Sequence, residues 1–241
     1  MSVNTNNAGS PVIVLFGSPG SGKGTQAKLL HECFHWPHIS TGDMLRSHIA
    51  AEDEIGIKVK DLMKGGHLVP DDLVNDLVKV RIAQPDCKPG VILDGYPRTV
   101  KQAEVLVDSF AHSGMRPAVV HLLVDHGRIV ARLSSRRQCP VCGTLYNNKT
   151  HPPKVAGVCD LDGAELTIRE DDKEEVIQAR LDEYDMQTHP LLDYFRQAGL
   201  PMIETQGASK PPEQIMKAIC DSLLQARMIQ AEIVPSVNGA L

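Results

Sequence analysis

The sequence predicts an α/β fold in which helices cover both faces of a parallel sheet. Two observations support this: short apolar runs end at a glycine or an acid, and the segments between them carry apolar residues at helical spacing. Parallel strands need crossover connections, and helices supply them. In such sheets ligands bind beyond the carboxyl ends of the strands, where this chain places Gly17, Ser40, Asp94 and Asp125.

The first predicted strand, residues 12–16, leads directly into a glycine-rich loop and a helix. The loop, residues 17–25, matches the phosphate-binding pattern G-x-x-x-x-G-K-[ST], except that Gly24 stands between Lys23 and Thr25. Glycines let backbone N–H groups converge on a phosphate, the helix presents its positive end, and the lysine adds a cation. An ordinary glycine-rich turn is the alternative, but the flanking strand and helix favour a nucleoside triphosphate site.

Helical spacing returns four times between the first and second predicted strands. The predicted helices are residues 23–33, a helix that begins at residues 40–43, residues 54–63, and a helix with apolar positions from 73 to 82. Gly65 and Gly66 end the third helix. Pro70 and the two acids after it suit the N-terminus of the fourth, because they supply a fixed φ and negative charge at the positive end of the helix dipole.

The second predicted strand, residues 91–94, ends in Asp94. In a chain that already has a phosphate loop, this is a common way to place a carboxylate near the magnesium of a nucleotide. A solvated acid at a strand end is the alternative. The later predicted elements alternate in the same manner: helix 99–111, strand 118–124, helix 128–137, a helical stretch at 171–197, strand 201–204 and helix 212–227.

Residues 138–168 break this alternation, because they are rich in proline, glycine and asparagine and show no helical period. They contain Cys139-x-x-Cys142 and, after 16 intervening residues, Cys159-x-x-Asp162. This spacing is typical of a structural zinc site with Asp162 as the fourth ligand, and His151 is the rival for that position. Three free cysteines, or a disulfide between Cys139 and Cys142, are the alternatives; a reducing compartment disfavours the disulfide.

The composition argues against several classes of protein. A net charge of −5 over 241 residues gives no reason to expect nucleic acid as a partner, and no apolar run approaches the roughly 20 residues that span a bilayer. Residues 1–10 and 231–241 are predicted to be loose tails. The six cysteines fit a reducing compartment better than a disulfide framework, so we expect a cytoplasmic protein, and nothing in the sequence demands more than a monomer.

A group of cationic side chains falls near the predicted element ends that face the ligand edge of the sheet. Surface arginines are usually solvated, and that is the alternative for each one alone. Together they suit a cleft that holds two nucleotides, because phosphoryl transfer depends on positioning and charge neutralisation. The group consists of Lys23, Arg46, Arg98, Arg132, Arg136, Arg169 and Arg180.

These motifs together resemble the adenylate kinase family in its long form, which has a metal-binding lid. The resemblance rests on GSPGSGKGTQA, STGDMLR, LVPDDLV, LDGYPRT with Gln102 after it, and the arginine-flanked insertion, and it runs from about residue 12 to 212. The family's phosphate loop also ends in Lys-Gly-Thr, which accounts for Gly24. The resemblance implies a P-loop three-layer sandwich with a five-stranded parallel sheet. It also implies a core of residues 11–39, 70–131 and 170–230, a helical segment at 40–69 that binds the nucleoside monophosphate, and a zinc-binding lid at 132–169.

The resemblance also implies roles for individual residues. The implied ATP site consists of Gly20, Ser21, Gly22, Lys23, Gly24, Thr25, Arg132, Arg136, Gly207 and Lys210. The implied AMP site consists of Thr41, Arg46, Gly95, Arg98, Gln102, Arg169 and Arg180, with Arg98 on the phosphate and Gln102 on the adenine. Catalysis would fall to Lys23 and to Arg98, Arg132, Arg136, Arg169 and Arg180, with Arg132 along the ATP base. The acid pair Asp171 and Asp172 matches the lid hinge, and the metal ligands would be Cys139, Cys142, Cys159 and Asp162.

The implied reaction is Mg²⁺-dependent transfer of a phosphoryl group from ATP to AMP, giving two ADP. Kinases for UMP, CMP or GMP are rivals within the same class. A GTP-binding switch would need N-K-x-D, and the nearest match, residues 148–151, ends in histidine; a zinc ribbon that binds nucleic acid conflicts with the acidic charge.

Three positions depart from the family pattern. Ala131 and Ser135 stand where the family commonly has Asp and Gly before the two arginines that begin the lid, and Ser135 is predicted to stiffen the hinge. The loop at 125–127 lacks the proline-and-acid start often seen there, which leaves the neighbours of the ATP base open.

Overall fold

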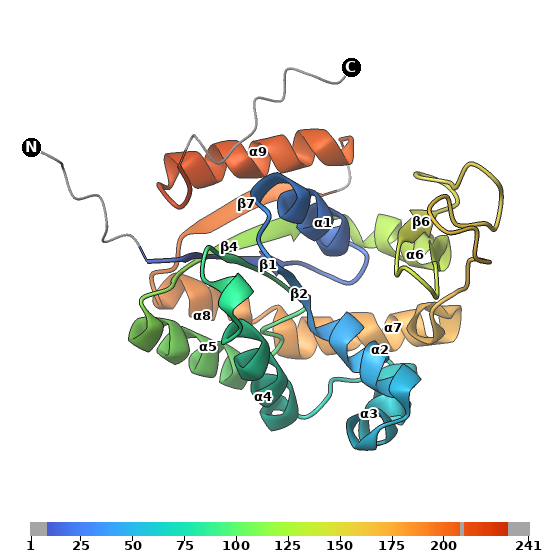
Figure 1. Ribbon diagram of the computed structural model, residues 1–241, viewed down its shortest axis with the longest axis horizontal. Helices are drawn as coiled ribbons and strands as arrows, with labels where there is room; N and C mark the ends of the chain where they lie inside the picture. Colours follow the sequence, from blue (N-terminus) through green and yellow to red (C-terminus); the bar gives the residue numbers. More distant parts are fainter. Residues whose placement is uncertain (1–8, 208–209, 231–241) are drawn as a thin grey trace, which may run out of the picture.

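The computed structural model describes residues 9–207 and 210–230, and a five-stranded parallel sheet runs through the middle of this part of the chain (Figure 1). Its strands lie in the order β2-β3-β1-β4-β7. They are β1 (Pro11–Phe16), β2 (His38–Ser40), β3 (Val91–Asp94), β4 (Arg116–Leu123) and β7 (Met202–Gln206). The α/β fold with a five-stranded parallel sheet is therefore confirmed.

Helices cover both faces of the sheet and form two separate apolar cores. Ile13 and Leu15 of β1 face α1 (Lys23–Phe34) and α9 (Pro212–Gln225), which lie above the sheet in Figure 1. Val12, Val14 and Phe16 face the opposite way, as expected from the alternation of side chains along a strand. They pack in the core formed by α4 (Asp71–Ile82), α5 (Val100–Ser113) and α8 (Leu191–Gln197).

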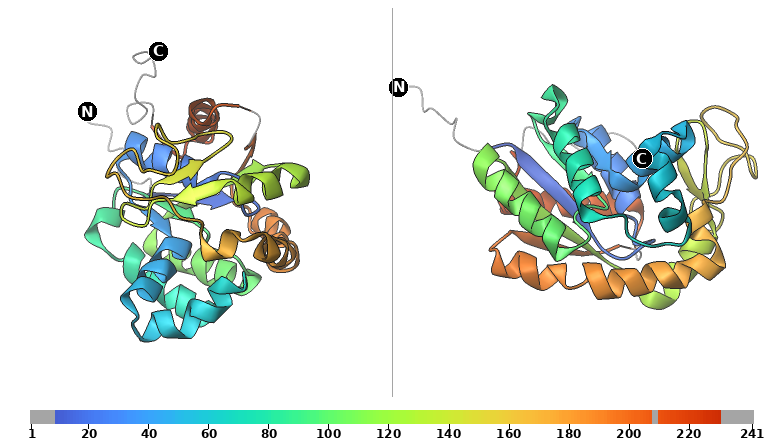
Figure 2. Two further views of the ribbon diagram at one scale, coloured as in Figure 1. Left: turned by 90° about the vertical axis from the view of Figure 1, so that its right-hand side faces the viewer. Right: turned by 90° about the horizontal axis from the view of Figure 1, so that it is seen from below.

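Two inserted segments lie at the same end of the sheet, beyond the carboxyl ends of the strands (Figures 1 and 2). The first contains α2 (Thr41–Ala51) and α3 (Glu54–Lys64). The second follows α6 (His126–Ser134) and contains the antiparallel pair β5 (Arg136–Gln138) and β6 (Leu145–Asn147). Gln138 and Thr167, near its two ends, exchange backbone hydrogen bonds of 2.9 Å each. We call residues 40–69 the AMP segment, after the role that the resemblance implies for them, and residues 132–169 the lid.

The chain returns to the core through α7 (Glu174–Glu183), which packs on α6 through Ile129, Leu133, Ile177 and Leu181. Short turns join the remaining elements: 3₁₀ turns at Pro85–Cys87 and Glu170–Asp172, and a π-helical turn at Tyr184–Thr188. Among the described residues, no helix combines the length and the apolar character that crossing a membrane requires.

The structure differs from the prediction at three elements. Strand β2 was not predicted, because three residues are too few to show alternation. The helix predicted at 128–137 ends at Ser134, and Arg136 already belongs to β5, so that prediction was wrong at its C-terminal end. The stretch predicted as helical at 171–197 is interrupted before Leu191, where Pro190 cannot donate a backbone hydrogen bond.

The predicted tails fall largely outside the described residues. The structure describes residues 9 and 10 of the first, where the Ser10 hydroxyl donates to the Lys88 carbonyl at 2.6 Å. Residues 231–241 lie outside the described part.

Candidate active site

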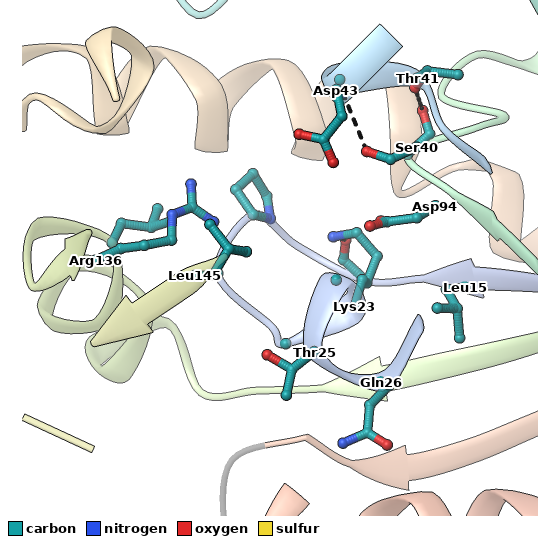
Figure 3. A pocket seen from close by; sticks show the side chains of 18 of the residues that line it. Leu15, Lys23, Thr25, Gln26, Ser40, Thr41, Asp43, Asp94, Arg136 and Leu145 are labelled. Carbon is teal, nitrogen blue, oxygen red and sulfur yellow. Dashed lines mark hydrogen bonds between the residues drawn. The ribbon is translucent and has the colours of Figure 1, made fainter. Parts of the chain in front are cut away.

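A cavity of about 780 Å³ opens at the carboxyl ends of the strands, a volume typical of small-molecule sites (Figure 3). The phosphate loop, the AMP segment, the lid and the start of α9 all contribute to its walls. Of the residues implied for the ATP and AMP sites, all line the cavity except Ser21, whose side chain is fully buried beneath the loop. The structure therefore brings together residues that are up to 190 positions apart, from Gly20 to Lys210.

The phosphate loop is held in shape by glycines and by its own lysine. Gly20 and Gly22 have φ values of 76° and 103°, which side chains rarely adopt. The Lys23 ammonium donates to the carbonyls of Gly17 and Ser18 at 2.7 and 3.0 Å. Burial lowers the pKa of Lys23 to about 8, and Asp94 only partly opposes this shift.

Asp94 faces the phosphate loop from the end of β3 (Figure 3). A Cβ added to Gly24 would lie 3.4 Å from its Oδ2 atom, so the loop approaches the carboxylate closely. His38 Nε2 lies 3.3 Å from the same oxygen. Burial alone would raise the pKa of Asp94, but the His38 hydrogen bond and the Lys23 charge outweigh it and hold this pKa below its usual range. Asp94 is therefore a charged, largely buried carboxylate beside the loop, not a solvated strand end.

The opposite half of the cavity is organised around Gly95. Its carbonyl accepts hydrogen bonds from Thr41 Oγ1 at 2.8 Å and from Arg98 Nε at 2.9 Å. Gly95 has φ 77°, and an added Cβ would come within 3.0 Å of Arg98 and 3.1 Å of Thr41. Glycine is thus required there for two reasons, the backbone conformation and the space needed by the two neighbouring side chains.

Gln102 also lies in this half of the cavity and links Arg98 to Asp71. Its Oε1 accepts from the Arg98 backbone N–H, and its Nε2 donates to Asp71 Oδ1, each at 2.8 Å. One lone pair and one N–H of the amide remain for a ligand. Thr188, from the π-helical turn, donates to the Arg98 carbonyl at 2.9 Å.

Carboxylates hold the arginines where the lid joins the core. Arg136 donates twice to Asp172, at 2.6 and 2.5 Å, and Arg180 donates to the same carboxylate at 2.7 Å. Asp171 Oδ2 lies 3.2 Å from Arg180. Burial lowers the pKa of Arg180, and Asp171 offsets this in part. The acid pair thus fixes two guanidinium groups that would otherwise repel each other across the cavity.

Arg132, the first arginine of the lid, contacts the phosphate loop. Its Nε donates to the Gly20 carbonyl at 3.0 Å. Its Nη2 would lie 3.5 Å from a Cβ at Gly22, and the Gly207 carbonyl would lie 3.6 Å from that same point. Arg132 therefore lies between the loop and the segment before α9, where Gly207 and Lys210 line the cavity.

Asp43 was assigned no role in the site from the sequence, yet its carboxylate contacts two of the implied phosphate ligands. Its Oδ1 accepts from Arg46 Nη2 at 2.6 Å and lies 3.5 Å from Arg169 Nη2. Burial alone would raise the pKa of Asp43, but the two arginines outweigh it and lower the pKa to about 2. The Arg46 Nε is buried and has no hydrogen-bond partner in the described residues.

The lid brings the predicted metal ligands together. The sulfurs of Cys139, Cys142 and Cys159 and a carboxylate oxygen of Asp162 all lie within 4.8 Å of one another. The two turns that carry them are each closed by an equivalent backbone hydrogen bond: Gly143 N donates to Cys139 O at 3.1 Å, and Gly163 N donates to Cys159 O at 3.0 Å. Three thiolates and one carboxylate in a cluster of this size fit a tetrahedral metal site.

His151 does not join this cluster. Its ring stacks on Tyr146 with 6.2 Å between ring centroids and an interplanar angle of 13°. Asp162 is held instead by the Ala164 backbone N–H, which donates to its Oδ1 at 3.0 Å. The geometry favours Asp162 over His151 as the fourth ligand.

The departures at 125–135 have structural consequences at the hinge. Asp125 accepts from the Gly127 backbone N–H at 2.9 Å and so caps α6; it does not line the cavity, unlike the other residues placed at the strand ends. Ser135 is buried and ends α6 with φ −89°, a conformation that needs no glycine. The Asn148 N–H donates to its carbonyl at 3.0 Å, which ties the lid to the hinge.

Sequence reasoning missed His38, Asp43 and Thr188 as parts of the site. His38 belongs to the strand that was not predicted, and Thr188 reaches the site through a contact 90 positions away in the chain. Asp43 offered a signal, because an acid one helix turn before an arginine that is implied to bind phosphate is a natural partner for it.

The comparisons with known proteins agree on one family. A model of the adenylate kinase family matches residues 15–200. The chain is 50% identical over 187 residues to an adenylate kinase of Thermosipho melanesiensis, a match that covers 77% of this chain and 87% of that protein. It is 48% identical over 201 residues to an adenylate kinase of Anaeromyxobacter dehalogenans, covering 83% and 94%. The corresponding enzyme of Methanocella arvoryzae is 46% identical over 201 residues, covering 83% and 93%.

Proposed function

This chain belongs to the adenylate kinase family, and we propose that it transfers a phosphoryl group from Mg-ATP to AMP in the cavity at the strand ends, giving two ADP. The observation that carries the proposal is that one cavity holds a phosphate loop and, facing it, a second cationic half built on Gly95, Arg98 and Arg46. A donor phosphate on the loop and an acceptor phosphate on the arginines would meet between them. This is the geometry that direct transfer requires.

The proposed donor site consists of Gly20, Ser21, Gly22, Lys23, Gly24, Thr25, Arg132, Arg136, Gly207 and Lys210. Lys23 would exchange the carbonyls of its own loop for a phosphate, and Ser21 would contribute through its backbone. Asp94 and the Thr25 hydroxyl are the groups suited to hold Mg²⁺ with its waters, since one is a charged carboxylate beside the loop and the other lines the cavity. Mg²⁺ supplies neutralisation of the charge on the phosphates.

The proposed acceptor site consists of Thr41, Arg46, Gly95, Arg98, Gln102, Arg169 and Arg180. Arg98 and the unpartnered Nε of Arg46 would hold the AMP phosphate. The free lone pair and N–H of the Gln102 amide offer an acceptor and a donor on adjacent positions, which match the adenine edge of AMP. Rival monophosphates with another base edge would leave these buried groups unpaired, at a cost in affinity.

We propose that the AMP segment and the lid close over the two nucleotides and exclude water. Support comes from the cavity walls, because both segments line it together with the core. Exclusion of water lets AMP, and not water, take the phosphoryl group. Lys23, Arg98, Arg132, Arg136, Arg169 and Arg180 would neutralise charge on the transferring group during this step.

We propose Zn²⁺ as the metal of the lid, held by Cys139, Cys142, Cys159 and Asp162. The thiolate-rich donor set supports zinc over magnesium or calcium, which prefer oxygen ligands. With four protein ligands the site would be structural. It would stabilise a lid whose own apolar cluster is small, consisting of Cys139, Tyr146, Cys159 and Leu166 with Ala164 packed against it.

The proposal includes a monomer in the cytoplasm. The cavity walls come from one chain, and thiolate ligands need a reducing compartment to stay free. Sedimentation of the purified protein at micromolar concentration tests the first point.

Turnover of ATP with AMP, followed by coupled detection of ADP, tests the function. The native chain should use AMP in preference to UMP, CMP and GMP. Arg98→Ala and Lys23→Ala should each lower kcat/KM by about 10³-fold or more. Arg196→Ala is the matched control, since Arg196 is half exposed, pairs with Asp193 and lies outside the cavity. Losses below about tenfold in both site variants would count against these roles.

A further inference from the structure

Asp43 forms an ion pair that joins the AMP segment to the lid. It lies on the first turn of α2, and its Oδ1 lies 3.5 Å from Nη2 of Arg169, at the C-terminal end of the lid. Figure 3 shows the Asp43 side chain directed into the cavity. Any motion that separates the lid from the AMP segment must break this contact.

Both partners of this ion pair have further contacts. Arg169 is 9% exposed and is fixed by its Nε, which donates to Gln138 Oε1 at 2.6 Å within the lid. Asp43 is held by Ser40, whose hydroxyl accepts from the Asp43 N–H at 3.2 Å, and by Arg46. Each partner is thus also held by contacts within its own segment.

Arg46 and Arg169 both belong to the proposed acceptor site, and they come from different segments of the chain. Arg46 lies on α2 of the AMP segment, and Arg169 lies at the end of the lid. A carboxylate that contacts both guanidinium groups fixes their separation only when the two segments are together. It therefore favours the arrangement in which both arginines can reach one phosphate.

We propose that Asp43 is a positioning residue that couples closure of the lid to binding at the acceptor site, an inference that rests on the proposed function. ATP, by closing the lid, delivers Arg169 to Asp43 and so strengthens AMP binding. Coupling of this kind is reciprocal, so AMP strengthens ATP binding by the same factor.

The test measures the dissociation constant of AMP by calorimetry, without and with a saturating non-hydrolysable ATP analogue that has a β,γ-imido bridge. The dissociation constant without the analogue, divided by the constant with it, is the coupling factor. Direct effects of a substitution on AMP binding cancel in this ratio. The native protein should give a ratio above 1. Asp43→Asn should lower this ratio about two- to fivefold, the range of one partly exposed ion pair.

Two comparisons separate coupling from other effects. Asp61→Asn removes one exposed carboxylate from the same segment, on α3, and should keep the native ratio. In an Arg169→Gln background, Asp43→Asn should change nothing further, because the partner is already gone.

The outcomes distinguish this proposal from the proposed function. If Asp43→Asn tightens AMP binding equally with and without the analogue, Asp43 only competes with the phosphate and the coupling proposal is wrong. A fall in the ratio that persists in the Arg169→Gln background would also overturn it. If the native protein neither binds nor phosphorylates AMP, the function itself fails.

Discussion

The pKa values of single residues in this site are shifted by burial and by charged neighbours. Lys23 is buried among other cations, with Arg98, Arg136 and Arg180 lowering its pKa further, while Asp43 and Asp94 are kept ionised by basic partners. The ammonium therefore holds its proton less firmly than a surface lysine would, and the carboxylates lose theirs more readily.

The low pKa of Lys23 predicts that ATP binding takes up a proton near pH 9. The ligand-free lysine titrates at about pH 8, and phosphate charges beside it raise that pKa in the complex. The affinity for ATP should therefore be highest below about pH 8 and should fall as the pH rises through that value. Calorimetry at pH 9 in two buffers of different ionisation enthalpy measures the uptake.

Lys23→Arg is the control for this prediction, because a guanidinium stays charged at pH 9. That variant should show no proton uptake. Equal binding enthalpies in both buffers for the native protein would contradict the prediction.

The place of Asp162 in the cysteine cluster predicts how its substitution changes the zinc content of the protein. Asp162→Ala removes one of four ligands, so zinc per chain after dialysis should fall below one and the melting temperature should drop. Elemental analysis and calorimetry measure the two effects. His151→Ala should retain the metal, because that ring stacks on Tyr146 instead of facing the sulfurs. The reverse pattern would make His151 the ligand.

Elements with a strong local pattern could be predicted from the sequence. Strands β1 and β3 are continuous apolar runs that end at a glycine or an acid, and helix α4 has apolar residues at helical spacing after Pro70. Strand β2 is too short for a period, and β5 exists because residues 136–138 pair with β6, a contact that the arginine-rich local sequence does not reveal. The cationic residues of the site could be grouped from their places near the predicted element ends, and the family resemblance implied their separate roles. His38 and Thr188, in contrast, act through partners distant in the chain.

The hinge after α6 yields a prediction at the level of an element. Ser135→Gly adds backbone freedom at the helix end, so it should lower the free energy of unfolding by about 1 kcal/mol and raise kcat if lid opening limits turnover. Denaturant unfolding and steady-state turnover measure both. Ser134→Gly, one residue earlier within α6, should share the stability loss but leave kcat unchanged. Equal kcat values for the two variants would show that Ser135 does not control the hinge.

Across the whole molecule, the end of the sheet opposite the cavity holds the two ends of the described chain. Arg116, the first residue of β4, donates to the carbonyls of Gly9, Arg227 and Met228 at 3.2 to 3.3 Å. The cavity and the contacts of Arg116 thus lie at opposite ends of the same strands.

Arg116→Ala should therefore change stability without changing catalysis. Loss of these charge-assisted hydrogen bonds is expected to lower the free energy of unfolding by about 1–3 kcal/mol, with kcat/KM unaltered. Denaturant unfolding and turnover measure the two quantities, with Arg196→Ala as an exposed-arginine control. A matching loss of kcat/KM would mean that the two ends of the sheet are not independent.

Because Gln138 and Thr167 are hydrogen-bonded to each other, the lid is an insert whose two ends lie side by side. An insert with adjoining ends can be lengthened, trimmed or exchanged during evolution without displacing the frame that carries it. The means by which such an insert is stiffened, a metal or another, can then vary without changing the phosphate loop. A graft of another insert between residues 138 and 167 would preserve the frame on the same grounds.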